Sequence, residues 1–314
     1  MFNSRKYRHN NEQLILVLSI LLVLAVIILT SSVTFCVSGI FILGMFVISA
    51  LMIRSHHQSL MQHTLNINER TAPDLADVVS DCADKLQPGE VDVFLAKKNQ
   101  MNAYTFGLSS PKALVLYSPL LKVMSAGELK FIIGHEMGHV ALGHTWLNTI
   151  LGGLAGIPAP FGASILLYAV FRWWNRMCEF SADRAGLLAC GNKNHAISAL
   201  VKLVAPEVRN QREFEQALAV IDAEDDEVSN RVAELFQSHP MLIRRINELR
   251  EYTHTKEYIW LQEGINRNVG MRSAGTVQQA SETKPLISQT QPEDQQSLPK
   301  APEERWPWLN QIDD

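Results

Sequence analysis

Residues 135–139 read His135-Glu136-Met137-Gly138-His139, an HExxH pentad. If this segment is helical, the two histidines lie one turn apart on the same face, so both imidazole rings can point at one metal ion. Glu136 then lies beside them, next to the position where a water molecule would bind. This arrangement is typical of the active-site helix of zinc peptidases, and it makes the pentad the strongest functional signal in the chain.

The residues around the pentad predict that it is helical. Ser125 and Glu128 have the spacing of a capping box, in which each residue's side chain accepts a hydrogen bond from the other's backbone N–H. Apolar residues then recur through 129–142 at spacings that give one wide buried face. Gly134 and Gly138 lower helix propensity by about 1 kcal/mol each relative to Ala. We therefore expect them to serve close packing or access to the metal.

A catalytic zinc site needs a third protein ligand, and Glu179 is the candidate. Glu179 and Asp183 lie one turn apart in a second helical pattern, which runs from about Ser164 to a stop signal at Gly191. If Glu179 binds zinc, Asp183 could accept the second ring N–H of a ligating histidine and so fix its tautomer. The alternative is a solvated helix face that pairs with nearby arginines. Those arginines are Arg172, Arg176 and Arg184.

The two motifs together resemble a known family. The HEMGH pentad followed by the segment 179–183, Glu-Phe-Ser-Ala-Asp, is similar to the HtpX-like membrane zinc peptidases, which are gluzincins related to the CAAX prenyl endopeptidases. The likeness covers about residues 60–250. It implies that His135, His139 and Glu179 bind one zinc ion per chain and that Glu136 is the general base. It also implies an α+β, mainly α fold, with a zincin-type metallopeptidase domain and a small β-sheet.

Three strand-like segments, 91–95, 103–106 and 113–117, predict a small sheet beside the active-site helix, after a segment at 60–85 that looks helical. Asn102, Ala103 and Tyr104, which the resemblance also includes, would form an edge strand that binds an extended substrate backbone. The alternative is that they form only a structural hairpin.

His239 is a second candidate catalytic residue, and the resemblance extends to its His-Pro element. Because Pro240 can begin a helix at its first turn, His239 would either cap that helix or hydrogen-bond the oxyanion of the reaction. We assign the remaining candidates, His56, His57 and His144, to structural or surface positions.

The amino-terminal segment is the other strong feature of the chain. Residues 14–53 contain no charged side chain. As a helix they would extend about 60 Å, twice the roughly 30 Å core of a bilayer, so we expect two transmembrane helices within 14–55, with a break around 30–34. Positive residues flank this hairpin at both ends, namely Arg5, Lys6, Arg8 and Arg54. The positive-inside rule therefore predicts a cytoplasmic segment 1–13 and a cytoplasmic catalytic domain in the cell inner or plasma membrane.

The zinc peptidase domain is expected to span residues 56–265. Within it, residues 145–171 are also free of charge but are interrupted by Gly and Pro, so they either re-enter the membrane or pack as core. The following Arg172-Trp173-Trp174 favours membrane contact, because this composition is typical of interfacial anchors. Residues 266–314 are rich in Gln, Ser, Thr and Pro and are expected to be a disordered tail, in which 306–309 could dock.

Composition limits the other classes of partner. The net charge of −4 and the lack of a basic stripe with interleaved aromatic residues argue against nucleic acid. The four cysteines form no CxxC pair, which is typical of a reducing compartment or of simple packing. Cys178 lies beside Glu179 and could be an alternative ligand, but neighbouring positions on a helix face different ways, which favours packing.

The sequence thus predicts a membrane-anchored zinc endopeptidase whose partners are protein or peptide substrates, membrane proteins among them, and the lipid bilayer. Misfolded or membrane-associated proteins are the expected substrates, and prenylated peptides are the alternative. Two other classes stay open: a zinc-stabilised membrane scaffold without proteolytic activity, and a membrane oxygenase that binds iron through paired histidines. Glu136 argues against the scaffold because a structural zinc site does not need it, and the oxygenase usually needs several histidine clusters.

Overall fold

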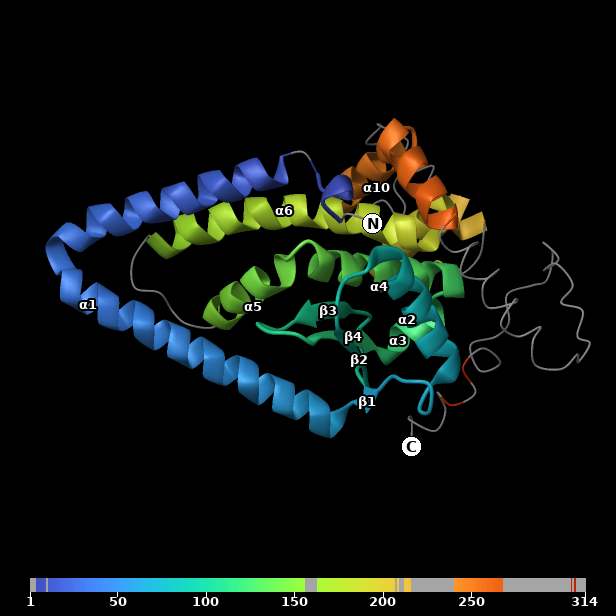
Figure 1. The fold of residues 1–314 in the computed structure, drawn as a ribbon, viewed down its shortest axis with the longest axis horizontal. Helices are drawn as coiled ribbons and strands as arrows, with labels where there is room; N and C mark the ends of the chain where they lie inside the picture. The colour runs from blue at the N-terminus through green and yellow to red at the C-terminus, as the bar shows by residue number, and fades with distance from the viewer. Residues whose placement is uncertain are drawn as a thin grey trace, which may run out of the picture.

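The computed structural model describes residues 4–9, 11–155, 163–206, 208, 212–215 and 240–267, together with 306 and 308. A short 3₁₀ helix, η1 (Ser4–Tyr7), precedes α1 (Glu12–His63), which carries the uncharged amino-terminal run. Figure 1 shows α1 as two long arms that meet at a bend, with both of its ends at the globular part of the molecule. The first arm runs alongside α6 (Ala163–Cys190), which it contacts.

The predicted break between two helices at 30–34 is wrong, because the helical backbone continues through these residues. Ser and Thr weaken a helix but do not force it to end as Pro does, and residues 12–63 contain no proline. The structure thus has one continuous helix, with a bend along its length, instead of two separate helices (Figure 1). In the part of the chain that the structure describes, no helix is both long and apolar enough to cross a bilayer.

The predicted small sheet follows α1, and it has four strands rather than the three that the sequence indicated. Its strands are β1 (Leu65–Asn66), β2 (Val91–Ala96), β3 (Ala103–Phe106) and β4 (Lys112–Tyr117), in the spatial order β1-β2-β4-β3. β2 pairs with β4 in parallel, and the other two pairs are antiparallel. β3 therefore lies at an edge of the sheet and also forms a hairpin with β4, so both alternatives given for this segment remain open.

A helix was expected over residues 60–85, but residues 64–72 are not helical. Residues 64–72 separate α1 from α2 (Pro73–Leu86), and the Asn68 side chain there accepts hydrogen bonds from the backbone N–H groups of Arg70 and Thr71. Asparagine competes with helical hydrogen bonding in this way, and Pro73 is suited to the first turn of the next helix.

The remaining helices surround the sheet and one another. They are α3 (Ser118–Val123), α4 (Ala126–Ala141), α5 (His144–Ala155), α7 (Lys193–Val204) and α10 (Pro240–Thr253), and residues 256–267 are also helical. α4 packs against three helices, α2, α6 and α7, and against the strands β3 and β4 of the sheet. The active-site pentad therefore lies in the centre of a mainly helical domain, which confirms the predicted fold class at this level.

Close packing of α4 on α6 brings the two sequence motifs together. A Cβ atom on Gly134 would lie 2.4 Å from the Cβ of Ala189, and one on Gly138 would lie 2.5 Å from the Cβ of Ala185. Real Cβ atoms do not approach so closely, so only glycine fits at these two positions. The expectation that the glycines serve close packing is confirmed.

The other predicted segments are described only in part. Of the apolar stretch 145–171, α5 and the start of α6 are helical, and residues 156–162 lie outside the described residues. The predicted disordered tail, 266–314, also lies outside them, except for residues 266–267, Trp306 and Trp308. Trp306 is 1% exposed and belongs to the main apolar core. This part of the tail therefore packs on the domain itself.

Candidate active site

The helix that carries the pentad begins as the sequence predicted. The Ser125 side chain accepts from the backbone N–H of Glu128 at 3.3 Å, and the Ser125 N–H donates to the Glu128 carboxylate at 2.6 Å. Glu128 is itself buried, and it also contacts Lys202 and Ser198 of α7. The capping box thus anchors the start of α4 to a neighbouring helix as well as satisfying its first backbone N–H groups.

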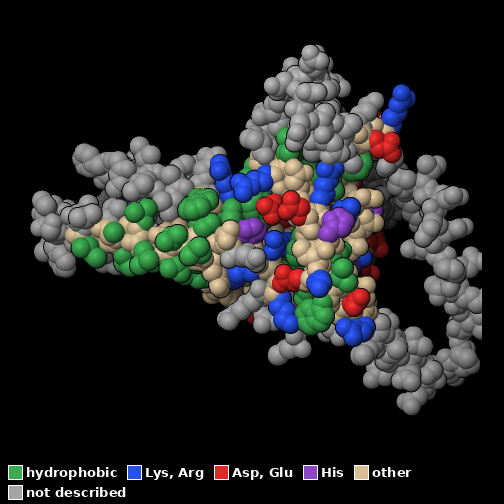
Figure 2. All heavy atoms as spheres, turned by 90° about the horizontal axis from the view of Figure 1, so that it is seen from above, with side chains coloured by type: hydrophobic (Ala, Val, Ile, Leu, Met, Phe, Trp, Pro, Cys, Tyr) green, Lys and Arg blue, Asp and Glu red, His purple; other side chains and the backbone are tan. Residues whose placement is uncertain are grey.

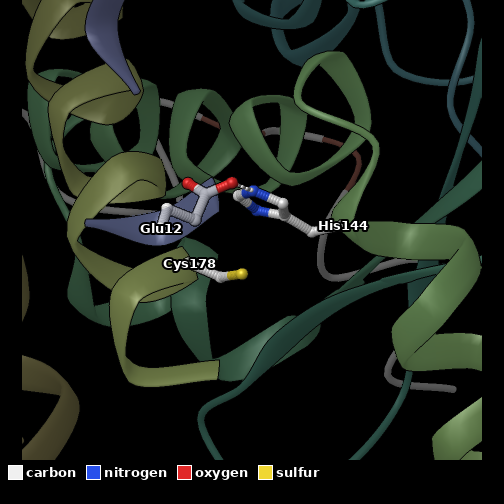
Figure 3. Close-up of side chains that lie close together, drawn as sticks. All are labelled: Glu12, His144 and Cys178. Atoms are coloured by element: carbon white, nitrogen blue, oxygen red, sulfur yellow. Dashed lines mark hydrogen bonds and ion pairs between the residues drawn. The ribbon is translucent and has the colours of Figure 1, made fainter. Parts of the chain in front are cut away.

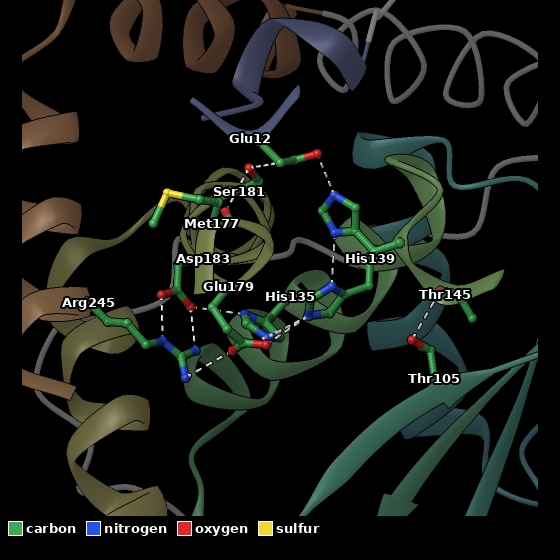
Figure 4. Close-up of polar contacts among 11 residues, drawn as sticks. Glu12, Thr105, His135, His139, Thr145, Met177, Glu179, Ser181, Asp183 and Arg245 are labelled. Atoms are coloured by element: carbon green, nitrogen blue, oxygen red, sulfur yellow. Dashed lines mark hydrogen bonds and ion pairs between the residues drawn. The ribbon is translucent and has the colours of Figure 1, made fainter. Parts of the chain in front are cut away.

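His135, His139 and Glu179 converge on one point between α4 and α6 (Figure 4). The Nε2 atoms of the two histidines are 3.2 Å apart, and each is 3.5 Å from one oxygen of the Glu179 carboxylate. The three residues each place one potential ligand atom within 4.8 Å of the others. Two imidazole nitrogens and one carboxylate oxygen form a donor set that suits a catalytic zinc ion.

Asp183 lies behind His135 and accepts a hydrogen bond from its Nδ1 at 2.9 Å. Arg245 of α10 donates to both oxygens of Asp183, at 2.6 and 2.7 Å, and contacts Glu179 at 3.2 Å. Asp183 is only 1% exposed, so it does not belong to a solvated helix face. Because a carboxylate can only accept, the Nδ1 of His135 carries the proton, and its Nε2 lone pair faces the convergence point.

A match to peptidase family M48 covers residues 69–253, which include both motifs. The chain belongs to this family. Among its relatives, the plastoglobule-localized metallopeptidase 48 of Arabidopsis thaliana is 28% identical over 217 residues, which are 64% of this chain and 63% of that protein. An HtpX protease homolog of Streptococcus thermophilus is 27% identical, with 61% of this chain and 77% of that protein covered.

Protease HtpX of a Psychrobacter species is 30% identical over 200 residues, which are 52% of this chain and 64% of that protein. The chain thus spans less than two thirds of the Arabidopsis and Psychrobacter proteins. These matches confirm the HtpX-like resemblance within the M48 peptidases.

The electrostatics of the M48 site separate its two glutamates. Burial raises the pKa of Glu136, and the nearby Glu179 carboxylate raises it further, which outweighs the effect of the two histidines. Burial also acts on Glu179, but the positive Arg245 and the two histidines outweigh it and hold the pKa of Glu179 far below its usual value. Near neutral pH Glu179 is therefore ionised, whereas Glu136 takes up a proton more readily than an exposed glutamate would.

A proton and a metal cation would compete for His139. Burial lowers the pKa of His139, but its hydrogen bond to Glu179 and the charges of Glu179 and Glu136 raise it above the usual value. The same negative charges attract a cation, and a ligating histidine must be deprotonated at the ligand nitrogen. The electrostatics of the site therefore fit a bound metal ion.

The edge strand β3 lies beside the pentad. Thr105 of β3 lies close to the side chain of Glu136, and its Oγ1 atom is 3.2 Å from that of Thr145 in α5. Asn102 is exposed, and Ala103 and Tyr104 are half-buried on the same strand. Thr105, the residue that follows the predicted substrate-binding residues Asn102, Ala103 and Tyr104, is thus the part of β3 next to the candidate general base.

His239 lies outside the described residues, so its two alternative roles stay predictions. Pro240 does begin α10, as expected from its position. The sequence indicated only a structural or surface position for His144, but this residue is 1% exposed and its Nδ1 atom lies 3.0 Å from the Nδ1 of His139. The assignment of His144 to a structural or surface position is therefore incomplete: it is buried against a candidate metal ligand.

Sequence reasoning also missed Arg245 and Glu12. Arg245 follows a helix start that the sequence predicted, but nothing in its neighbours indicates a partner 62 residues away. Glu12 lies 132 residues before His144, with which it forms a hydrogen bond of 2.9 Å. The one available signal was indirect: Glu12 is the last charged residue before an uncharged run.

Proposed function

We propose that the chain is a membrane-anchored, zinc-dependent endopeptidase that cleaves misfolded or membrane-associated proteins. One observation carries the proposal: His135, His139 and Glu179 converge from two helices, and the buried Glu136 lies beside them. A structural zinc site would need no such glutamate, and it would normally use cysteine ligands. Membership of peptidase family M48 supports the same reaction class.

Each residue then has a distinct role. Zinc, when bound by His135, His139 and Glu179, would supply Lewis acidity toward the peptide carbonyl and lower the pKa of a water molecule. Glu136 accepts a proton from the attacking water and delivers it to the leaving amine as the C–N bond breaks. A carboxylate beside the attacking water can first take a proton and then give it, which is the role of a general base that becomes a general acid. Asp183 holds the ring of His135 in one orientation.

Substrate binding is assigned to the edge strand. An extended peptide would pair with Asn102, Ala103 and Tyr104 on the side of β3 that faces away from β4, which would bring its backbone to Glu136. Recognition through the backbone would suit misfolded chains, because it does not depend on a particular side chain. We also propose that His239 donates a hydrogen bond to the oxyanion, since it immediately precedes α10, the helix that carries Arg245.

The apolar surface of α1 supports the membrane anchor. Leu14, Leu21 and Ile28 are between 56% and 68% exposed. Figure 2 shows apolar side chains spread along the elongated end of the molecule, while charged side chains gather at the opposite end. No helix of the described residues qualifies by itself as a membrane span, so the topology rests on the uncharged run 14–53 of the sequence. On that basis we propose that the two arms of α1 cross the cell inner or plasma membrane and that segment 1–13 and the catalytic domain are cytoplasmic.

The membrane proposal can be tested separately from catalysis. If α1 anchors the chain, the protein should stay in the membrane fraction after alkaline carbonate extraction. A reporter that works only in the cytoplasm should be active when fused to the C-terminus. Release by carbonate would contradict the anchor, and an inactive reporter would contradict the orientation.

Cleavage of an unfolded model protein by detergent-purified enzyme tests the catalytic proposal. Glu136→Gln should keep one zinc ion per chain and lose at least about 100-fold in rate, because it removes the general base. Glu179→Ala should lose zinc affinity, and activity removed by a chelator should return with added zinc. Glu69→Gln, at an exposed position outside the site, is the matched control. Cleavage by Glu136→Gln at the wild-type rate would contradict the mechanism, and full zinc occupancy without any cleavage would favour the scaffold.

A further inference from the structure

The amino-terminal segment reaches the candidate active site through His144. The first residue of α5, His144, lies between His139 and Glu12: its Nδ1 is 3.0 Å from the Nδ1 of His139, and its Nε2 is 2.9 Å from Oε1 of Glu12. Figure 3 shows the Glu12 carboxylate facing the imidazole ring of His144. Glu12 is completely buried and His144 nearly so. A carboxylate from the first turn of α1 is therefore two hydrogen bonds away from a candidate metal ligand.

The direction of these hydrogen bonds follows from the chemistry of the carboxylate. Ionised Glu12 can only accept, so the Nε2 of His144 must be the donor. The Nδ1 of neutral His144 then carries a lone pair, which makes the Nδ1 of His139 the donor in its turn. The remaining lone pair of His139 is on Nε2, the atom that faces His135 and Glu179. The charge on Glu12 thus selects the ligating tautomer of His139.

Several contacts hold Glu12 in this position. Arg8 donates to its Oε1 at 2.6 Å and also to the backbone oxygen of Leu142, just after α4, at 2.8 Å. Ser181 of α6 donates to the other carboxylate oxygen, and the backbone N–H of His9 donates to Ser181 at 2.9 Å. Arg8, His9 and Glu12 are therefore hydrogen-bonded to α6 or to the residue that follows α4, and these two helices carry the candidate zinc ligands.

The same cluster has the composition of a second metal site, because Cys178 places its sulfur close to Glu12 and His144 (Figure 3). Two observations favour a hydrogen-bonded network instead. The guanidinium of Arg8 already neutralises Glu12 and would repel a cation. Both ring nitrogens of His144 also have hydrogen-bond partners.

We propose that Glu12 is a positioning residue, which fixes the tautomer and the orientation of His139 through His144 and so makes the first turn of α1 a part of the active site. The inference rests on the proposed zinc site. Partners of this kind hold a ligating histidine in place, and their loss typically weakens metal binding by about 10- to 100-fold. Because Glu12 is in the first turn of α1, a displacement of that helix would also displace a support of the zinc ligand.

Zinc affinity, measured by competition with a chelator on the full-length protein, tests the proposal. Glu12→Ala and His144→Ala should each weaken zinc binding by about 10- to 100-fold. The zinc affinity of the double variant should equal, within about threefold, that of the single variant that binds zinc less tightly. Both changes break the same chain of contacts, so their effects should not add. Glu12→Gln keeps the shape but removes the charge, and it should give a smaller loss that still exceeds threefold. Glu69→Ala, at an exposed site, should bind zinc as wild type does.

A second readout separates positioning from stability. In cobalt-substituted protein, Glu12→Ala and Glu12→Gln should shift the visible absorption bands, which depend on ligand geometry, whereas a loss of fold stability alone would leave the bands of the folded protein unchanged. Wild-type zinc affinity in both Glu12 variants would refute the inference while leaving the proposed function intact. Wild-type protein that binds no zinc would refute the proposed function itself. If wild type binds two zinc ions per chain and Cys178→Ala binds only one, then the cluster is a second metal site and the positioning role of Glu12 is refuted.

Discussion

Replacing Gly138 with alanine should force α4 and α6 apart. A Cβ atom at this position would lie 2.5 Å from the Cβ of Ala185 and 3.3 Å from the Cα of Ala182. Ordinary carbon–carbon contacts are about 3.5–4.0 Å, so the first contact is too short by about 1 Å. Neither neighbour can relieve it by a rotamer change, because a Cβ and a Cα move only with the backbone.

The expected cost follows from two opposing effects. Overpacking a buried site costs about 1–3 kcal/mol, whereas replacing glycine by alanine within a helix gains up to about 1 kcal/mol. We expect a net loss of about 1–2 kcal/mol in the free energy of unfolding. In a domain of about 200 residues this lowers the melting temperature by roughly 2–8 °C. The shift should also weaken zinc binding, since Gly138 lies between two candidate ligands on α4 and Glu179 is on α6.

Thermal and urea unfolding of the zinc-free protein in detergent provide the assay. Gly264→Ala is the matched control: this glycine is also helical, but no heavy atom lies within 4 Å of its added Cβ, so the variant should be as stable as wild type or more stable. Adding Ala185→Gly to Gly138→Ala should recover part of the loss, with a coupling of at least about 1 kcal/mol. A Gly138→Ala variant as stable as wild type, or additive effects in the double variant, would refute the packing argument.

Two buried carboxylates lead to further predictions. Glu128→Gln should lower the free energy of unfolding by about 1.5–3 kcal/mol near pH 7, because it weakens hydrogen bonds to a buried charged group. Burial raises the pKa of Glu128, but hydrogen bonds from Lys202 and Ser198 lower it below its usual value; its stabilisation is therefore present above about pH 4.5 and lost as pH falls through the lowered pKa. Urea unfolding between pH 7 and 3 should show a shallower acid decline in the variant, and equal slopes would contradict this. Arg245→Met should lower the free energy of unfolding of the zinc-free protein by about 3–5 kcal/mol, because the buried Asp183 carboxylate loses its counter-charge. A loss below about 1 kcal/mol would show that the ion pair between Arg245 and Asp183 adds little to stability.

Much of the local structure could be predicted from the sequence because its causes are local. The capping box of Ser125 and Glu128, the stop at Gly191 and the helix start at Pro240 all depend on residues within one turn of each other. The strands β2, β3 and β4 were predicted to within one residue, since β-branched and aromatic runs bounded by turn residues have few alternatives.

The errors arose where a local pattern allowed two outcomes. The segment 64–72 continues an apparently helical composition, but the Asn68 side chain binds the backbone of the next residues and favours a turn. At 30–34 the Ser and Thr residues weaken the helix but do not end it, and the helix continues. Propensity alone does not separate these cases, because the alternatives differ by only a few tenths of a kcal/mol per residue.

The same distinction applies to the candidate site. The sequence by itself determined the chemistry available there: two histidines one turn apart, a glutamate beside them, and a second pair of carboxylates on another helix. Only the tertiary structure decided which groups support them, namely Arg245 behind Asp183, and Glu12 with His144 behind His139. The physical reason is distance along the chain. Helical spacing fixes the relative positions of residues within a few turns, whereas contacts over 60 to 130 residues depend on how whole helices pack, which no local pattern records.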